Sequence, residues 1–136
     1  MKIGHLLLTP LFFTLLSLHI HAATITVTNT IAQAIEQAQD GDTVLVNGPS
    51  VFSEHLVIGK SIRLVGTNSP TIDASSSGTA LTLEAPNIEV NGVHIRNTGG
   101  NLATFDSGIM VKAPRALIHC IAASGLVARI AAPRRR

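Results

Sequence analysis

Apolar and polar residues alternate in short runs along most of this chain, and one run of ten residues occurs twice. The segment 81–90 (LTLEAPNIEV) returns as 109–118 (IMVKAPRALI), with its Ala-Pro pair at the same place in both copies. A looser third copy lies at 56–64 (LVIGKSIRL). Each copy contains two short alternating runs joined by a tight turn, which favours strands over helices. Repeats with a period of roughly 20–50 residues are typical of stacked, solenoid architectures.

The copies can be aligned in register, and the alignment predicts how the chain winds. The segment 62–66 aligns with 88–92 and with 116–120, and the second step is slightly longer than the first. Further short strands are expected at 71–74 and 93–96, after each corner. One coil then contributes about three strands, and successive coils pair in parallel. The sequence lacks the closely spaced two-residue turns of antiparallel hairpins, so a parallel β-helix is favoured over a sandwich.

The alternation assigns the two faces of these strands. Arg63, Glu89 and Leu117 fall at outward positions, and the residues on either side of each are apolar and face inward. Gly66 and Gly92 end their strands, where we expect a tight corner or a positive φ. The repeats therefore predict a narrow core of stacked aliphatic side chains.

The residues before the repeats have a different pattern. The alternating segment 24–28 predicts a strand, and 31–38 predicts a helix that Asn29 or Thr30 caps. The helix is apolar along one stripe only, which suits an element that covers the open end of a stacked sheet. A strand at 43–46 then leads into the coils.

The first residues have the three-part pattern of a secretory signal peptide. Lys2 supplies the positive start, an apolar run follows at 6–18, and Ala22 precedes a cleavage point before Ala23. An uncleaved membrane anchor is the alternative, but the run is short for a spanning helix and contains Pro10. We therefore predict export, which in a Gram-negative source places the mature protein in the periplasm.

Composition narrows the range of functions. The chain is 46% hydrophobic but only 3% aromatic, without Trp or Tyr. Its formal net charge is +2, yet residues 23–120 hold five basic and eight acidic residues, a net charge of −3. No basic stripe interleaved with aromatic residues is present, so we predict no nucleic-acid partner. The single cysteine excludes an intramolecular disulfide.

Several segments of the chain resemble known β-helix proteins. The stretch 34–46 (AIEQAQDGDTVLV) resembles the N-terminal segment of pectin-lyase-like proteins, and 55–66 (HLVIGKSIRLVG) resembles their first coil. More narrowly, four segments resemble the NosD family of periplasmic nitrous-oxide-reductase maturation proteins: 70–74, 80–88, 92–99 and 106–109. The resemblance covers about residues 24–119. It implies a right-handed parallel β-helix, here with about three coils and a short N-terminal capping helix.

The resemblance also implies an accessory role rather than catalysis. Proteins of this family work beside an ABC transporter, with its ATPase and permease, to support assembly of the copper–sulfur centre of nitrous oxide reductase. Copper is the implied metal, and the reductase and the transporter are the implied partners. Contact with the membrane is expected only through these partners.

The pattern breaks at about residue 120. Family members are much longer, and the segment that follows here is rich in Ala and Arg and contains no acid. We expect a truncated or frameshifted product whose open stack is poorly soluble; a helical cap with a solvated basic tail is the alternative. The predicted segments are a signal peptide at 1–22, a strand and capping helix at 23–50, coils at 51–120 and the tail at 121–136.

Candidate copper ligands are few and scattered. Soft or imidazole ligands in the mature chain are His55, His94, Met110, His119 and Cys120. His94 and His119 are separated by close to one coil, so stacking on neighbouring rungs is one arrangement; His119 and Cys120 are adjacent. These three residues are weak metal candidates, because solvent-facing strand histidines are the commoner case. Cys120 also occupies the corner position that Gly66 and Gly92 hold.

The acids do not predict a catalytic pair. Glycoside hydrolysis needs two carboxylates across one cleft. Asp40 and Asp42 lie in the turn after the helix, where a capping or solvated role is expected. Asp73 follows a strand and is expected to face outward, and Asp106 is expected to accept hydrogen bonds within its own turn. We predict that the protein is not an enzyme.

Two other interpretations stay open beside the accessory role. One is a carbohydrate-binding or polysaccharide-active β-helix, against which the absence of Trp and Tyr argues; the other is a non-functional gene fragment.

Gly59, Lys60 and Ser61 imitate the end of a phosphate-binding loop, but Glu54 stands where that loop needs glycine. The segment also joins two predicted strands, so no phosphate site is predicted.

Overall fold

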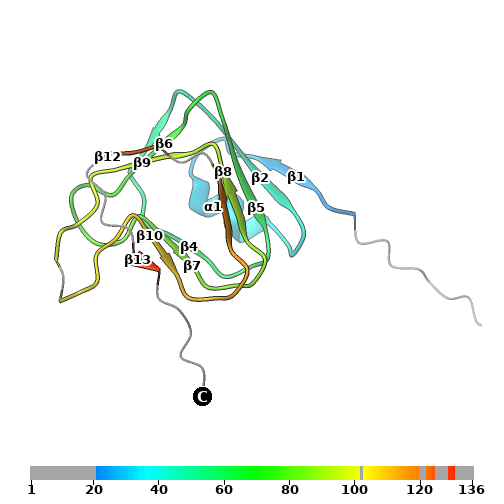
Figure 1. The fold of residues 1–136 in the computed structure, drawn as a ribbon. Helices are drawn as coiled ribbons and strands as arrows, with labels where there is room; N and C mark the ends of the chain where they lie inside the picture. Colours follow the sequence, from blue (N-terminus) through cyan, green and yellow to red (C-terminus); the bar gives the residue numbers. More distant parts are fainter. Residues whose placement is uncertain (1–20, 102, 120–121, 125–128, 131–136) are drawn as a thin grey trace, which may run out of the picture.

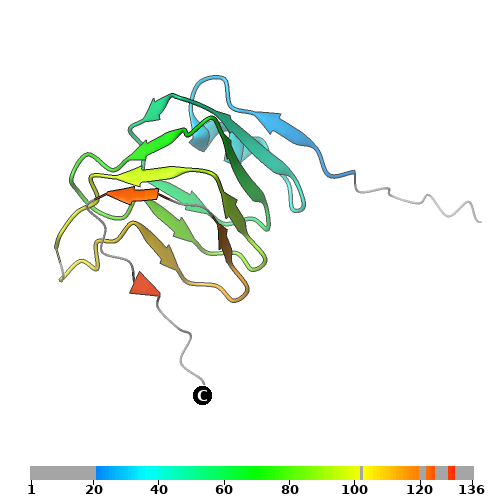
Figure 2. The same ribbon diagram turned by 45° about the horizontal axis from the view of Figure 1, so that its top comes forward.

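The structure is a computed structural model, and it describes residues 21–101, 103–119, 122–124 and 129–130. Three parallel sheets surround a common core, and each turn of the chain adds one strand to each sheet (Figure 1). Figure 2 shows the turns stacked in chain order, from blue and cyan at one end to orange at the other. The protein is therefore a mostly β, parallel β-solenoid of about three turns, as predicted. Its right-handed winding stays a prediction.

The strands of each sheet follow in order of the coils that supply them. The first sheet contains β1 (Thr24–Thr26), β2 (Thr43–Asn47), β5 (Arg63–Thr67), β8 (Glu89–Asn91) and β11 (Leu117–His119). The second sheet contains β3 (Val51–Phe52), β6 (Thr71–Asp73), β9 (His94–Arg96) and β12 (Ala122–Ser124). The third sheet contains β4 (Leu56–Ile58), β7 (Leu81–Leu83), β10 (Ile109–Val111) and β13 (Arg129–Ile130).

The register of the repeats is the one that the sequence predicts. Leu81 pairs with Ile109 and Val90 with Ile118, which are equivalent positions of the repeated phrase. The looser upstream copy pairs with the next copy at shorter sequence offsets: Leu56 pairs with Leu81, and Arg63 pairs with Glu89. The turn between β4 and β5 is therefore one residue shorter than the turn between β7 and β8.

The core consists of inward side chains stacked in columns. Leu64 and Val90 from the first sheet have no exposed surface, and Leu83 from the third sheet and Ile72 from the second meet them inside. Each such aliphatic side chain contributes about 1.5–3 kcal/mol by leaving water. Most of the buried core residues are Ile, Val, Leu and Ala, and Phe52 packs against them from β3.

Helix α1 (Ile31–Gln37) covers the end of the stack where the chain enters it (Figure 1). It buries Ile31, Ala34 and Ile35 against the first coil. Of the two predicted N-caps, Thr30 is the one that acts, since its side chain accepts a hydrogen bond from the Gln33 N–H at 3.2 Å. The helix ends one residue earlier than predicted, because Ala38 turns to an extended conformation.

Two charged residues from the first coil hold this short helix at its ends. The Glu54 carboxylate accepts hydrogen bonds from the N–H groups of Ile31 at 3.0 Å and Ala32 at 2.9 Å. At the other end, the Lys60 ammonium donates to the carbonyl oxygens of Ile35, Glu36 and Ala38, at 3.0, 2.7 and 2.6 Å. Each charge complements the helix dipole and satisfies backbone groups that lack partners within the helix.

The two predicted glycine corners are confirmed, although each depends on glycine differently. Gly92 takes a positive φ of 69°, while Gly66 does not take a positive φ. A Cβ on either residue would collide with the carbonyl oxygen of the other, and one on Gly66 would also lie 2.8 Å from Cγ of Pro70. The coils therefore approach so closely at this corner that only glycine fits.

Most of the predicted signal peptide and tail lie outside the described residues. His21, Ala22 and Ala23 are described and exposed, and Ala23 is the first of them to make hydrogen bonds with the fold. In the tail, the structure describes two short strands, β12 and β13, which extend the second and third sheets. No helix in the described part of the chain has the length and apolar character needed to span a membrane.

Candidate functional site

The predicted stacking of His94 and His119 is wrong. His119 lies on β11 in the first sheet and pairs with Asn91 of the coil before it. His94 lies on β9 in the second sheet, between Thr71 and Ala122. The two histidines therefore occupy different sheets, since the residue one full coil after His94 is Ala122 and not His119.

The other candidate ligands do not complete a metal site among the described residues. His55 hydrogen-bonds through Nδ1 to the Thr79 carbonyl oxygen at 2.9 Å, and Met110 is half-buried on β10 beside Thr82. Cys120 lies outside the described residues. Across the described ranges, no three His, Cys, Asp or Glu residues gather at metal-binding distance.

Asp73 differs from its prediction, because it ends β6 and is buried instead of facing solvent. The residue is 9% exposed, and its carboxylate accepts hydrogen bonds from the Ser75 N–H at 2.9 Å and from Arg96 Nε at 2.8 Å. The Asn97 amide donates to both carboxylate oxygens at 3.1 Å. These donors, led by the Ser75 N–H, lower the pKa of Asp73 below its ordinary value. Arg96 faces Asp73 directly in the register of β6 and β9, so the repeat alone could have predicted this pair.

Asp106 hydrogen-bonds its own turn, as predicted. It accepts hydrogen bonds from the Thr104 hydroxyl at 2.7 Å and from the Asn101 N–H at 3.1 Å. These two donors, the hydroxyl foremost, lower the pKa of Asp106. The carboxylate thereby fixes the long loop between β9 and β10, which projects from the solenoid in Figure 2.

The two acids after helix α1 also have structural roles. Asp40 accepts a hydrogen bond from the Ser61 N–H at 2.8 Å, which ties the helix end to the first coil. Asp42 is 7% exposed and accepts from the N–H groups of Gln39 and Ala23, both at 2.8 Å. These hydrogen bonds, that of Gln39 first, lower the pKa of Asp42. Asp42 is therefore neither solvated nor a helix cap, the two roles predicted for it, because a carboxylate cannot donate to the free carbonyl groups at a helix end; it holds the turn after the helix.

Ion pairs link neighbouring coils on all three outer faces. Their distances are 2.9 Å for Arg63–Glu89, 2.8 Å for Arg96–Asp73 and 2.9 Å for Lys112–Glu84. Together with the helix caps and turns, they engage seven of the eight acids of the chain in holding the fold. A glycosidase needs a general acid whose pKa is raised, whereas all three resolved carboxyl shifts here are downward.

Strand β11 is the last described strand of the first sheet, and it is exposed along its whole length. Leu117 is 51% exposed at an outward position, beside Glu89 of β8. Ile118 continues the inward column of Val90, yet it is 38% exposed because no described strand lies beyond it. The sheet therefore ends in an apolar edge, which we call the β11 edge (Leu117–His119).

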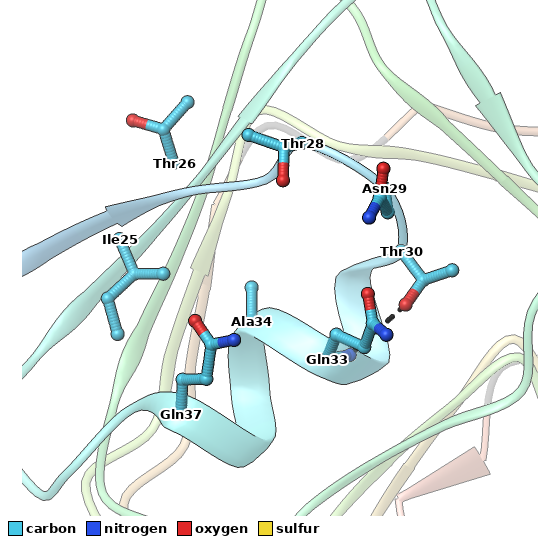
Figure 3. A pocket seen from close by; sticks show the side chains of 8 residues that line it. All are labelled: Ile25, Thr26, Thr28, Asn29, Thr30, Gln33, Ala34 and Gln37. Atoms are coloured by element: carbon cyan, nitrogen blue, oxygen red, sulfur yellow. Dashed lines mark hydrogen bonds between the residues drawn. The ribbon is translucent and has the colours of Figure 1, made fainter.

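A polar pocket of about 250 Å³ lies at the opposite end, between β1 and helix α1 (Figure 3). It is lined by Ile25, Thr26, Thr28, Asn29, Thr30, Gln33, Ala34 and Gln37. None of these side chains is charged. Within the described residues, the side-chain amides of Asn29, Gln33 and Gln37 make no hydrogen bond to the protein, so they are free to bind a ligand.

The fold and these surfaces define a parallel β-solenoid whose neighbouring coils are linked by ion pairs on their outer faces. One end carries the polar pocket, and the other carries the exposed β11 edge. Comparison of the chain with models of known protein families and with curated proteins gave no match.

Proposed function

We propose that this protein is an exported accessory factor that acts by binding other proteins, as the NosD family that its sequence resembles does. In this proposal it assists assembly of the copper centre of nitrous oxide reductase, beside an ABC transporter. Two observations favour this role over catalysis: the acids are engaged in holding the fold, and the solenoid offers an exposed apolar strand. Copper enters as the metal of the client reductase.

The observation that carries the proposal is the β11 edge. An exposed strand presents unpaired backbone N–H and C=O groups, and a partner can add a strand of its own to it. Leu117 and Ile118 supply the apolar side chains that such a partner would cover. Exposed apolar groups beside an open strand mark a protein-binding surface more often than a catalytic one.

The test is co-purification of the exported protein with nitrous oxide reductase and with the transporter from a denitrifying host. We expect Leu117→Lys to abolish capture, because it places a charge inside the contact. Val57→Lys is the matched control, since Val57 is 56% exposed on β4 of another sheet and lies far along the stack from β11. Equal capture by both variants, or full reductase copper content in a strain without the gene, would refute the proposal.

A second candidate function is carbohydrate binding at the polar pocket. The three amides without a described protein partner offer both donors and acceptors, while Ile25 and Ala34 supply an apolar surface for the C–H face of a sugar ring. At about 250 Å³ the pocket is smaller than the roughly 300–1,000 Å³ of drug-sized sites, so it suits a single sugar ring. Without an aromatic platform, we expect affinity on the order of millimolar.

This candidate is tested by titrating methyl glycosides against the protein and following backbone amide NMR signals. Gln33→Met and Gln37→Met keep helix propensity and side-chain length, and each should weaken binding several-fold. Gln39→Met lies outside the pocket and should leave binding unchanged. NMR shifts of the same size with the simple amide N-methylacetamide would show that the pocket binds amide groups instead of sugars.

A further inference from the structure

Asp42 holds the backbone nitrogen of Ala23, the residue at which the fold begins. Its Oδ1 accepts the Ala23 N–H at 2.8 Å, while Oδ2 accepts the Gln39 N–H at the same distance. The Ala23 carbonyl in turn accepts the Thr43 N–H at 2.8 Å, so both ends of this residue are fixed. His21 and Ala22, which precede it, are exposed and make no described hydrogen bond to the fold.

This geometry has a chemical consequence at the predicted cleavage point. A peptidase that hydrolyses the Ala22–Ala23 bond adds water across it, leaving a carboxylate on Ala22 and an amine on Ala23. At neutral pH that amine takes up a proton and becomes an ammonium group, because its ordinary pKa is about 7.7–8.0. The nitrogen that donates to Asp42 as a neutral amide would then carry a full positive charge.

We propose that Asp42 is a binding seat for the mature N-terminus, and that cleavage before Ala23 converts a neutral hydrogen bond into an ion pair. Asp42 is almost fully buried, and a buried carboxylate is costly unless it is compensated. Lys60, whose charge also acts on Asp42, is engaged with the carbonyl oxygens of helix α1. The new ammonium would supply a direct charged partner, at a place where β1, the end of α1 and β2 meet.

The ion pair would couple processing to folding. The exported chain gains stability only when its leader has been removed at this bond, since any residue left before Ala23 keeps its nitrogen as a neutral amide. Cleavage one residue earlier or later would place the ammonium out of reach of the seat. The proposal rests on the export part of the proposed function and is independent of its partners.

The experiment begins with the full chain, expressed with its own leader at 1–22 and recovered from the periplasm. Intact mass should give a chain that starts at Ala23. The α-amine is then dimethylated with a ¹³C label, which preserves its charge, and its pKa is measured by NMR. We expect a pKa above the ordinary range of about 7.7–8.0 in the native protein, and a return to that range in Asp42→Asn.

Acetylation of the α-amine provides a second measurement, since it removes the charge. Lys60 and Lys112 are the only other amines left after cleavage, so peptide mass analysis can verify that the α-amine alone has been acetylated. Acetylation should lower the melting temperature by roughly 2–8 °C in the native sequence and by much less in Asp42→Asn. Dimethylation should change it little in either.

The possible failures are distinguishable. A chain found only in the cytoplasm would refute export and with it the proposed function, whereas a full-length mass from the periplasm would refute cleavage and therefore the seat. A chain that starts at a different residue would refute the seat while leaving export intact. An Ala23 start with an ordinary amine pKa, or equal effects of acetylation in both sequences, would also overturn the seat.

Discussion

The Lys60 ammonium at the end of helix α1 allows the sharpest test of how this fold is held. Helix α1 has seven residues, far fewer than the roughly 12–15 that an isolated helix needs to be even marginally stable in water. It therefore depends on contacts from the first coil. Lys60→Met keeps the length and apolar stem of the side chain and removes only its charge and donors.

The magnitude follows from the contacts that are lost. Three carbonyl oxygens at 2.6–3.0 Å lose a charged donor, but they lie near the surface where water replaces part of it. The lost interaction with the helix dipole adds about 0.3–1 kcal/mol. We expect a total of about 2 kcal/mol, which corresponds to a drop in melting temperature of roughly 5–10 °C for a domain of this size.

The assay is urea unfolding followed by circular dichroism, together with hydrogen exchange of the amides of helix α1. Lys112→Met is the matched control, because it breaks an ion pair with Glu84 whose two side chains are 52% and 43% exposed. That change should cost at most about 0.5 kcal/mol. Amides of α1 should exchange faster in Lys60→Met only. Equal losses of stability in the two variants would refute the argument that Lys60 acts as a helix cap.

Two further predictions follow from the turns and corners. The carboxyl groups of Asp42, Asp73 and Asp106 have a lower pKa in the folded protein than the 3.8 of the unfolded chain, so they stabilise the fold fully above pH 3.8. Stability should therefore fall as the pH drops from 3.8 through the folded-state pKa values. A melting temperature that stays flat between about pH 5 and 2 would contradict this. Gly92→Ala should cost at least about 2 kcal/mol in urea unfolding, whereas Gly100→Ala, where a Cβ meets nothing within 4 Å, should be nearly neutral.

The strand register was predictable because each coil repeats the same inward positions. A shift of the strand register by one residue would place Arg63 or Glu89 in the core, so the alternation permits only one alignment. The corner at Gly66 and Gly92 followed from the same alignment. Even the pairs Arg96–Asp73 and Lys112–Glu84 lie at equivalent positions of neighbouring coils, and they could have been read from the repeat.

Contacts that cross between different kinds of element were not predictable in this way. Glu54 and Lys60 lie in turns of the first coil, and nothing in the repeat indicates that a helix upstream ends against them. The histidine prediction failed for a related reason. Coils differ in length, so the shorter offset that pairs β4 with β7 does not apply from β9 onward, where His94 pairs with Ala122.

The distribution of bonds within the solenoid indicates where we expect the proposed partners to bind. In a solenoid each coil contacts only its neighbours, so backbone groups inside the stack are paired and only the two ends leave them open. On the outer faces, three ion pairs also engage charged side chains between neighbouring coils. One end carries the polar pocket and the Asp42 seat, and the other carries the β11 edge. We therefore expect the proposed partners to bind at an end of the stack, and substitutions on the outer faces should affect binding far less than substitutions at the ends.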